Sequence, residues 1–264
     1  MVSTSTTISS NIDETFAALR GKSKRALVGY LTAGFPDAER CVDCLRALDD
    51  GGADVIELGV PFSDPIADGP VIQASSQRAL EMGMTLERTL EMAATASLRA
   101  PIVLFSYLNP ILAAGPDVLD RAAAAGVSGI LLTDLPVGSD AAREEWLSSG
   151  PLSFIRLVAP TTPRERMAEI AKHGSGFVYL ISRLGVTGAR ATAPEGLRET
   201  VARLRSATKL PICAGFGIST ADQAREVGSI ADGVVVGSAL VSAAAVSADS
   251  VLRLTRELRA ALDS

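Results

Sequence analysis

One short stretch, residues 54–70, places an acid in an apolar run and two more acids in the loop that follows. Glu57 lies near the end of the β-branched run 54–58. A carboxylate there must be paired, hydrogen-bonded or functional, because burial disfavours its charged form. Asp64 and Asp68 follow in a loop stiffened by prolines, and each alone is more typical of a loop cap or a solvated charge. Glu57 is therefore the first candidate for a general acid or base.

Other catalytic side chains are scarce, which narrows the chemistry. The single histidine, His173, just precedes an expected strand, away from the loops that follow strands. The four lysines also precede strands: Lys22, Lys24, Lys172 and Lys209. A histidine base, a histidine-ligated metal and a Schiff-base lysine therefore lack a candidate residue, and carboxylates remain.

Cys41 and Cys44 form a C-x-x-C pair, which could indicate a metal or redox site. With Leu45 and Leu48, however, they follow the i, i+3, i+4, i+7 spacing of an apolar helix face. There is no second C-x-x-C to complete a zinc site, and Cys213 lies in a strand-like run. The pattern favours core packing.

The elements that must position these residues alternate as strand and helix. The expected strands are 25–31, 54–58, 101–106, 128–133, 153–158, 176–181, 210–214 and 231–236. The expected helices are 8–19, one from Asp37 to the glycines at 51–52, 71–81, 86–99, one ending near 126, 139–148, 164–173, one ending near 206, and 249–262.

Most of the strands are continuous apolar runs, as parallel strands covered on both faces should be. We expect an α/β fold, a single (β/α)₈ TIM barrel with an extra N-terminal helix, in one domain spanning 1–264, with residues 1–7 frayed. An open doubly wound sheet is the alternative, but its switch-point signature is missing.

The composition limits the partners and the compartment. The net charge of −5 and the lack of basic runs argue against nucleic-acid binding. We see no apolar run long enough to span a bilayer, and the Ser/Thr-rich start lacks a signal-peptide pattern. We expect a cytoplasmic protein.

Aromatic side chains gather where the strands should end. All three tyrosines, Tyr30, Tyr107 and Tyr179, fall at or near strand ends, and Phe105 and Phe216 belong to the same rim. In a barrel these ends form the mouth at which active sites are built. The pattern favours an aromatic-walled pocket for a flat apolar ring over simple core filling.

Two glycine-rich turns, 215–219 and 237–239, follow the last two strands. Glycines let the backbone approach an anion, and barrels often bind phosphate after strands seven and eight. A plain turn would explain either segment alone. Neither is a dinucleotide fingerprint or a P-loop. The long loop 182–194 is expected to be a mobile lid over an anionic substrate, with simple disorder as the alternative.

The chain resembles the tryptophan synthase α subunit family over nearly its whole length. The matching motifs are GYLTAGFPD from Gly29, ELGVPFSDPIADGP from Glu57, NPIL from Asn109, TDLP from Thr133, APTTP from Ala159, SRLGVTG from Ser182, AGFGIS from Ala214 and ADGVVVGSALV from Ala231. The resemblance implies retro-aldol cleavage of indole-3-glycerol phosphate to indole and glyceraldehyde 3-phosphate, without metal or cofactor in this chain.

The resemblance also implies roles for particular residues. Glu57 would be the general acid/base, and Asp68 would accept the indole N–H. The ring and reacting centre would be lined by Tyr30, Ile72, Phe105, Leu131, Tyr179, Phe216 and Val235. Phosphate would be held by Gly188, Gly217, Gly237 and Ser238. Thr187 of the lid would meet Asp64 on closure.

The family works with a pyridoxal-phosphate β subunit in an αββα heterotetramer, to which indole passes through a tunnel. By resemblance the docking surface is the barrel mouth, including Pro61, Asp64, Asn109 and Pro110. Leu108 stands where an aromatic residue is common, and Phe105 and Val235 vary pocket residues, which bears on affinity rather than on the reaction.

Two other functions stay open at this point. One is a different phosphosugar enzyme, such as an isomerase, or an enzyme with Mg²⁺ held by Asp64, Asp68 and Asp134. The other is a non-catalytic member that only activates a β subunit. The presence of both Glu57 and Asp68 argues against the second.

Overall fold

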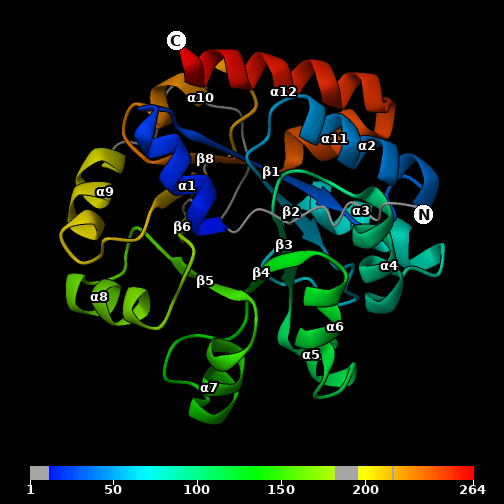
Figure 1. The fold of residues 1–264 in the computed structure, drawn as a ribbon, viewed down its shortest axis with the longest axis horizontal. Coiled ribbons are helices and arrows are strands. Elements are labelled where there is room, and N and C mark those ends of the chain that lie inside the picture. Colours follow the sequence, from blue (N-terminus) through cyan, green and yellow to red (C-terminus); the bar gives the residue numbers. More distant parts are fainter. Residues whose placement is uncertain (1–11, 182–195, 216) are drawn as a thin grey trace, which may run out of the picture.

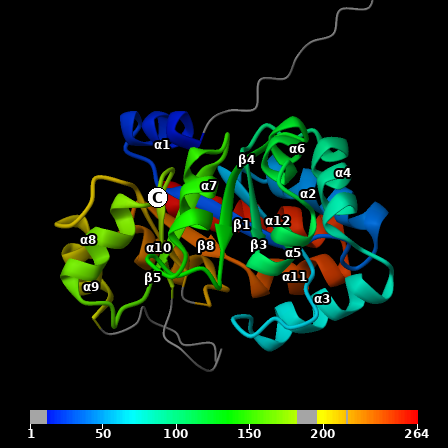
Figure 2. The same ribbon diagram turned by 90° about the horizontal axis from the view of Figure 1, so that it is seen from below.

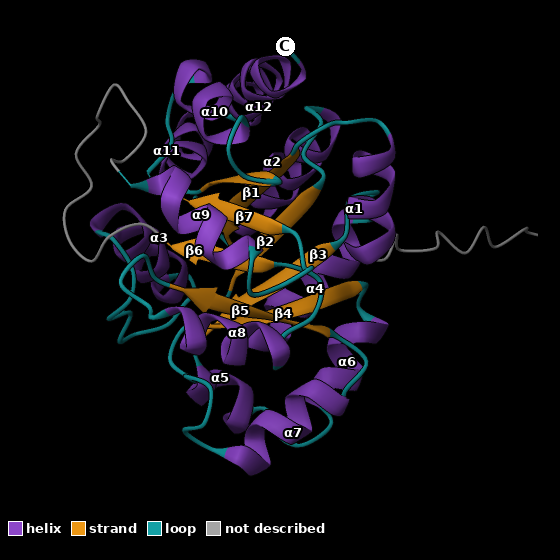
Figure 3. Ribbon diagram, turned by 90° about the vertical axis from the view of Figure 1, so that its left-hand side faces the viewer, coloured by secondary structure: helices purple, strands orange, loops and turns teal. Residues whose placement is uncertain are grey.

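A computed structural model of the chain describes residues 12–181, 196–215 and 217–264. In these residues eight parallel strands form a closed barrel in sequence order, with β1 also paired to β8. The strands are β1 (Ala26–Thr32), β2 (Val55–Gly59), β3 (Ile102–Ser106), β4 (Val127–Leu132), β5 (Ser153–Val158), β6 (Val178–Ile181), β7 (Ile212–Gly215) and β8 (Gly233–Val236). The predicted (β/α)₈ barrel is confirmed (Figures 1 and 3).

Helices surround the barrel. They are α1 (Ile12–Gly21), α2 (Ala38–Asp50), α3 (Pro70–Glu81), α4 (Leu86–Ala96), α5 (Leu108–Ala113), α6 (Val118–Ala124), α7 (Ala141–Ser149), α8 (Arg164–Lys172), α9 (Leu197–Arg205), α10 (Ala221–Gly228), α11 (Ser238–Val246) and α12 (Ala248–Asp263). Figure 1 shows α2, α10, α11 and α12 together on one side, where the last helices pack against the first barrel helix. Among the described residues, no helix is long and apolar enough to cross a membrane.

The helix pattern differs from the expectation in three places. The helix expected to end near residue 126 is two helices, α5 and α6, because Gly115 adopts φ 94° and Pro116 follows it. The sequence pattern defined no bounds for α10 and α11. Helix α10 does carry a start signal, since Thr220 and Gln223 form a capping box. Helix α11 is rich in Ala, Ser and Val and carries no charged residue.

A separate cluster of buried side chains fills the barrel interior. Its members from the strands are Ala26, Val28, Val55, Val103, Leu131, Ile155, Cys213 and Val235, and Phe177 joins them just before β6. Phe105, Leu157 and Tyr179 pack against this cluster. Glu57 pairs in register with Tyr30 of β1 and Val103 of β3, so the acid stands among interior residues.

Helix α1 closes one end of the barrel. Its buried side chains, Ile12, Phe16 and Leu19, belong to the interior cluster, and the Phe16 ring centroid lies 5.6 Å from that of Phe177. A methyl group added to Gly129 would come to 2.8 Å from Ile12 Cδ1, so the helix sits directly on the strand starts. Figure 2 shows α1 at one end of the strands and α3 at the other. The carboxyl ends of the strands therefore form the end of the barrel opposite α1, which is called the mouth here.

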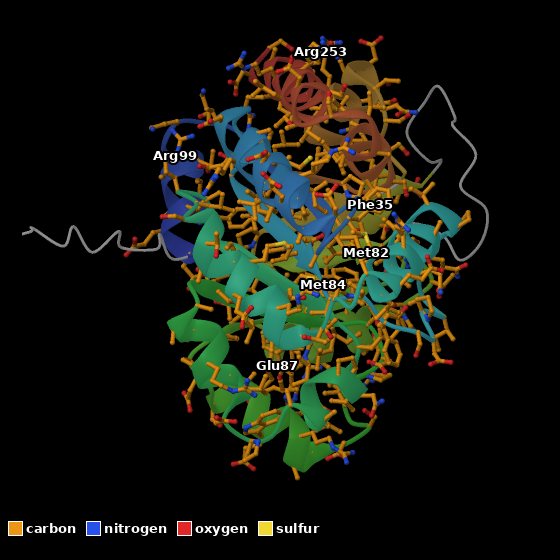
Figure 4. All side chains as sticks on the ribbon, turned by 90° about the vertical axis from the view of Figure 1, so that its right-hand side faces the viewer. Phe35, Met82, Met84, Glu87, Arg99 and Arg253 are labelled. Atoms are coloured by element: carbon orange, nitrogen blue, oxygen red, sulfur yellow. The ribbon has the colours of Figure 1, made fainter. Side chains whose placement is uncertain are left out.

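The loop after β1 fixes the helix that borders this mouth. Gly34 adopts φ 77°, and a Cβ there would lie 2.9 Å from Met84 Sδ. Figure 4 shows Phe35, Met82 and Met84 gathered at this contact. The hydroxyl of Thr32 also lies 2.6 Å from that of Ser75, which ties the end of β1 to α3.

The remaining polar candidates lie as expected. Cys41 and Cys44 are buried on α2 and pack in the outer core, so the C-x-x-C pair serves packing. His173 and the lysines are exposed and precede strands. Asp54, at the start of the acidic stretch, accepts hydrogen bonds from the Leu27 N–H at 2.8 Å and from Arg259 Nη1 at 2.7 Å. It joins α12 to the closed end of the barrel.

We predict that Phe16→Ala lowers the free energy of unfolding by about 3–5 kcal/mol, because it opens a cavity at the barrel floor. Urea denaturation measures the change. Ala17→Ser, on the exposed face of the same helix, should cost less than about 1 kcal/mol. Equal losses in the two variants would contradict the placement of α1 as a floor.

Candidate active site

Glu57 is the most buried acid of the mouth region, with 1% of its surface exposed. Its Oε1 atom is buried and has no hydrogen-bond partner among the described residues. Burial raises the pKa of the Glu57 carboxyl to about 8, because the charged form loses its hydration there. A carboxyl group with a pKa near neutrality can both give and take a proton.

Asp68 is the second carboxyl group of the site, and it is held differently. It lies half-buried in the loop between β2 and α3, and its Oδ2 accepts a hydrogen bond from the Tyr107 hydroxyl at 3.1 Å. Burial raises the pKa of Asp68 to about 6, and the bond from Tyr107 acts in the opposite direction. At neutral pH Asp68 is therefore mostly ionised.

Two tyrosines lean over glycines at the strand ends. The Tyr30 hydroxyl packs against Gly59, and the Tyr179 hydroxyl packs against Gly215. A Cβ atom added to these glycines would lie only 2.1 Å and 2.6 Å from the respective hydroxyl oxygens. Tyr30 also meets Phe105 edge to face, with centroids 5.3 Å apart. Burial raises the pKa of both tyrosines, so both stay neutral. The lack of a side chain on Gly59 and Gly215 gives the two tyrosines room to lie at the strand ends, where the sequence predicted an aromatic-walled pocket.

The other predicted lining residues lie in the same region. Leu131 and Val235 are buried in the barrel interior, and Ile72 is half-buried on α3, which borders the mouth. Phe216 lies outside the described residues. The described lining is apolar, which suits a flat ring.

The predicted phosphate end is partly described. Gly237 is the N-cap residue of α11, so no side chain caps the first N–H groups of this helix, and Ser238 is its first residue. Gly217, after β7, adopts φ 65° and is exposed. A helix start with free N–H groups is suited to an anion. Thr187, Gly188 and the expected lid 182–194 lie outside the described residues.

The predicted docking residues flank the mouth. Pro61 is buried, Asp64 and Asn109 are exposed, and Pro110 is half-buried. Ile66, in the same loop as Asp64, is 86% exposed. The sequence analysis did not single out Ile66, and a single exposed apolar side chain does not by itself define a contact surface.

The carboxylates named for a magnesium site do not form one. Asp134 Oδ1 accepts the Leu108 N–H at 2.7 Å, while Asp68 is bonded to Tyr107. Across the described ranges, no three His, Cys, Asp or Glu side chains are grouped so that they could hold a metal ion. The geometry therefore gives no support to the magnesium alternative.

Fold and site together define a (β/α)₈-barrel enzyme with a buried glutamic acid and a second carboxyl group at the mouth. The family model for the tryptophan synthase alpha chain matches residues 16–262, and the chain belongs to this family. It is accordingly a carbon–carbon lyase of tryptophan synthesis that catalyses the α reaction, the cleavage of indole-3-glycerol phosphate.

Named relatives agree with this assignment. The chain is 48% identical to the tryptophan synthase alpha chain of Desulfatibacillum aliphaticivorans, over 86% of this chain and 87% of the relative. It is 46% identical to that of Synechococcus elongatus, over 96% and 97%. Among solved structures it is similar to Mycobacterium tuberculosis tryptophan synthase, with a TM-score of 0.89 and 36% identity over 96% of this chain and 98% of that one.

We predict that Glu57 makes stability depend on pH. Its pKa is raised from 4.5 to about 8 on folding, so between these values the folded chain holds a proton that the unfolded chain has released. The free energy of unfolding should fall as pH rises through this window. Glu57→Gln should remove that slope, which urea denaturation at several pH values would show. A wild-type slope that persists in the variant would contradict the prediction.

Proposed function

We propose that Glu57 carries out the proton transfers of the α reaction and that Asp68 supports them from the indole nitrogen. The observation that carries this proposal is the enclosed Glu57 carboxyl group, with its unpartnered Oε1 and its pKa of about 8. An enclosed carboxyl group without a hydrogen-bond partner lowers the stability of the fold, so its presence calls for a functional reason. Its raised pKa suits a group that is protonated at the start of the cycle.

The reaction divides into two proton steps. Protonation of indole C3 by Glu57 places positive charge on the ring, and Asp68 stabilises that charge by accepting the ring N–H. The Glu57 carboxylate then takes the proton of the side-chain hydroxyl next to the ring. The C–C bond breaks, its electrons return to the ring, and the hydroxyl carbon becomes the aldehyde of glyceraldehyde 3-phosphate. Glu57 ends protonated, ready for the next cycle.

The lining and the phosphate end have separate tasks in this proposal. The indole ring lies in the apolar slot with Tyr30, Phe105, Leu131 and Tyr179, which excludes water from the charged intermediate. Ile72, Phe216 and Val235 complete the slot, and Gly188, Gly217, Gly237 and Ser238 hold the phosphate. Thr187 of the lid meets Asp64 on closure.

The partner and the compartment are also part of the proposal. We propose that Pro61, Asp64, Asn109 and Pro110 dock on a β subunit in an αββα complex, to which indole passes. Pyridoxal phosphate belongs to that subunit, and this chain needs no cofactor. The single domain acts in the cytoplasm. Membership of the tryptophan synthase alpha chain family supports these points.

The first test mixes the purified chain with indole-3-glycerol phosphate and a chelator, and measures indole with and without a β subunit. We expect indole in both cases, with more when the partner is present. Glu57→Gln should lower kcat by about 10²–10⁴-fold with the fold retained by circular dichroism. Normal turnover of that variant would refute the role of Glu57. Stimulation of the partner without indole would instead indicate an activator.

A second test addresses the phosphate end. Ser238→Asp should raise KM by about tenfold or more, because a carboxylate at the start of α11 repels the phosphate and competes for its N–H groups. The fold should tolerate the change, since acids favour helix starts. Ser229→Asp, an equal charge change at the opposite end of the barrel, serves as the control. Equal KM values in the two variants would count against this phosphate site.

A further inference from the structure

Asp68 presents a positioning problem that its own loop does not solve. The loop runs along the surface of the mouth, with Asp64 exposed and Ile66 86% exposed. Two backbone bonds shape it, from Ile66 N–H to Asp64 O at 2.9 Å and from Asp68 N–H to Pro65 O at 3.1 Å. Gln73 of α3 also donates from Nε2 to Asp68 O at 2.9 Å and to Pro65 O at 3.4 Å. All of these bonds hold backbone atoms of the loop, and none of them reaches the Asp68 carboxyl group. An N–H acceptor must be placed accurately to act on a bound ring.

Tyr107 provides a fixed point for this loop. It directly follows β3, and only 3% of its surface is exposed. Its ring packs on Phe62 near the start of the loop, with centroids 4.9 Å apart. Its hydroxyl accepts the Ala67 N–H at 2.9 Å and donates to Asp68 Oδ2 at 3.1 Å. One side chain from the rigid barrel therefore contacts both ends of the loop.

We infer that Tyr107 is the positioning residue for Asp68: its hydroxyl occupies Oδ2, so that Oδ1 is directed to the N–H of the indole ring. This inference rests on the proposed role of Asp68. It assigns to Tyr107 a task beyond that of a pocket wall. The phenol can donate only one hydrogen bond. Because it donates this bond to Oδ2 of Asp68, the other carboxylate oxygen is left for the substrate.

The electrostatics of the site agree with this geometry. A hydrogen bond to the ionised form lowers the pKa of Asp68, against the effect of burial. The titratable groups that interact with Asp68 from the packed elements are Tyr30 on β1, Tyr107 after β3 and Tyr179 on β6. The pKa of each is raised mainly by burial, so all three stay neutral while Asp68 titrates. Loss of the Tyr107 hydroxyl should therefore raise the pKa of Asp68.

Tyr107→Phe removes the hydroxyl and keeps the ring on Phe62. We expect kcat for indole-3-glycerol phosphate cleavage to fall about tenfold, the effect of one hydrogen bond to a charged group. The acid limb of the pH–rate profile should move up by about one pH unit. Phe62→Leu is the matched control, since it loosens the same contact but keeps the hydroxyl, and its acid limb should not move.

A double-mutant cycle tests whether Tyr107 acts through Asp68. In an Asp68→Asn background, adding Tyr107→Phe should change kcat by less than about twofold, because the carboxylate that the hydroxyl positions is already gone. The same tenfold loss in both backgrounds would overturn the inference. Carboxyl ¹³C NMR, with Asp68→Asn assigning the signal, should show the higher pKa in Tyr107→Phe without reference to activity.

The outcomes separate this inference from the proposed function. If Asp68→Asn is impaired while Tyr107→Phe has wild-type kcat, acid limb and carboxyl pKa, the inference fails and the role of Asp68 stands. If Asp68→Asn keeps wild-type kcat, the role of Asp68 fails and the inference fails with it. A shifted acid limb in Phe62→Leu equal to that in Tyr107→Phe would show that loop packing, not the hydroxyl, sets the pKa.

Discussion

The enclosure of one carboxyl group inside the barrel is the constraint on which the rest of the site depends. Glu57 stands in register with the neutral Tyr30 and with the apolar Val103, and α1 closes the far end of the barrel. In the proposed function, the substrate completes this enclosure from the mouth. A low-dielectric surrounding strengthens every interaction with the charge that the proposed mechanism places on the ring.

The two carboxyl groups differ because their surroundings differ, not because glutamate and aspartate do. Glu57 has no partner for Oε1 in the described structure, and its pKa rises to about 8. Asp68 receives a hydrogen bond and keeps some contact with solvent, so its pKa rises only to about 6. Near neutral pH one group holds its proton and the other does not. This separation is the basis for proposing Glu57 as the acid and Asp68 as the stabilising anion.

Much of this arrangement could be predicted from sequence, and the failures have physical causes. Continuous apolar runs at regular spacing predicted the barrel. Glu57 was recognised as a candidate because an acid in such a run must be paired, hydrogen-bonded or functional. The bond between Tyr107 and Asp68 could not be predicted, since it joins residues 39 apart and depends on the path of a loop. Gly115 and Pro116 mark the break between α5 and α6 in the sequence, but the prediction of a single helix ending near residue 126 did not take them into account. The start of α10 was likewise marked by a capping box, which the spacing of apolar residues alone does not reveal.

The floor helix has a consequence for the order of events during synthesis. Helix α1 precedes every strand of the barrel in the sequence, but its partner Phe177 is translated about 160 residues later, roughly 8–32 s at ordinary elongation rates. Until then the apolar face of Phe16 and Ile12 has no barrel to cover. This segment is thus among the last to find its place, and its apolar residues stay unburied while most of the barrel is being translated.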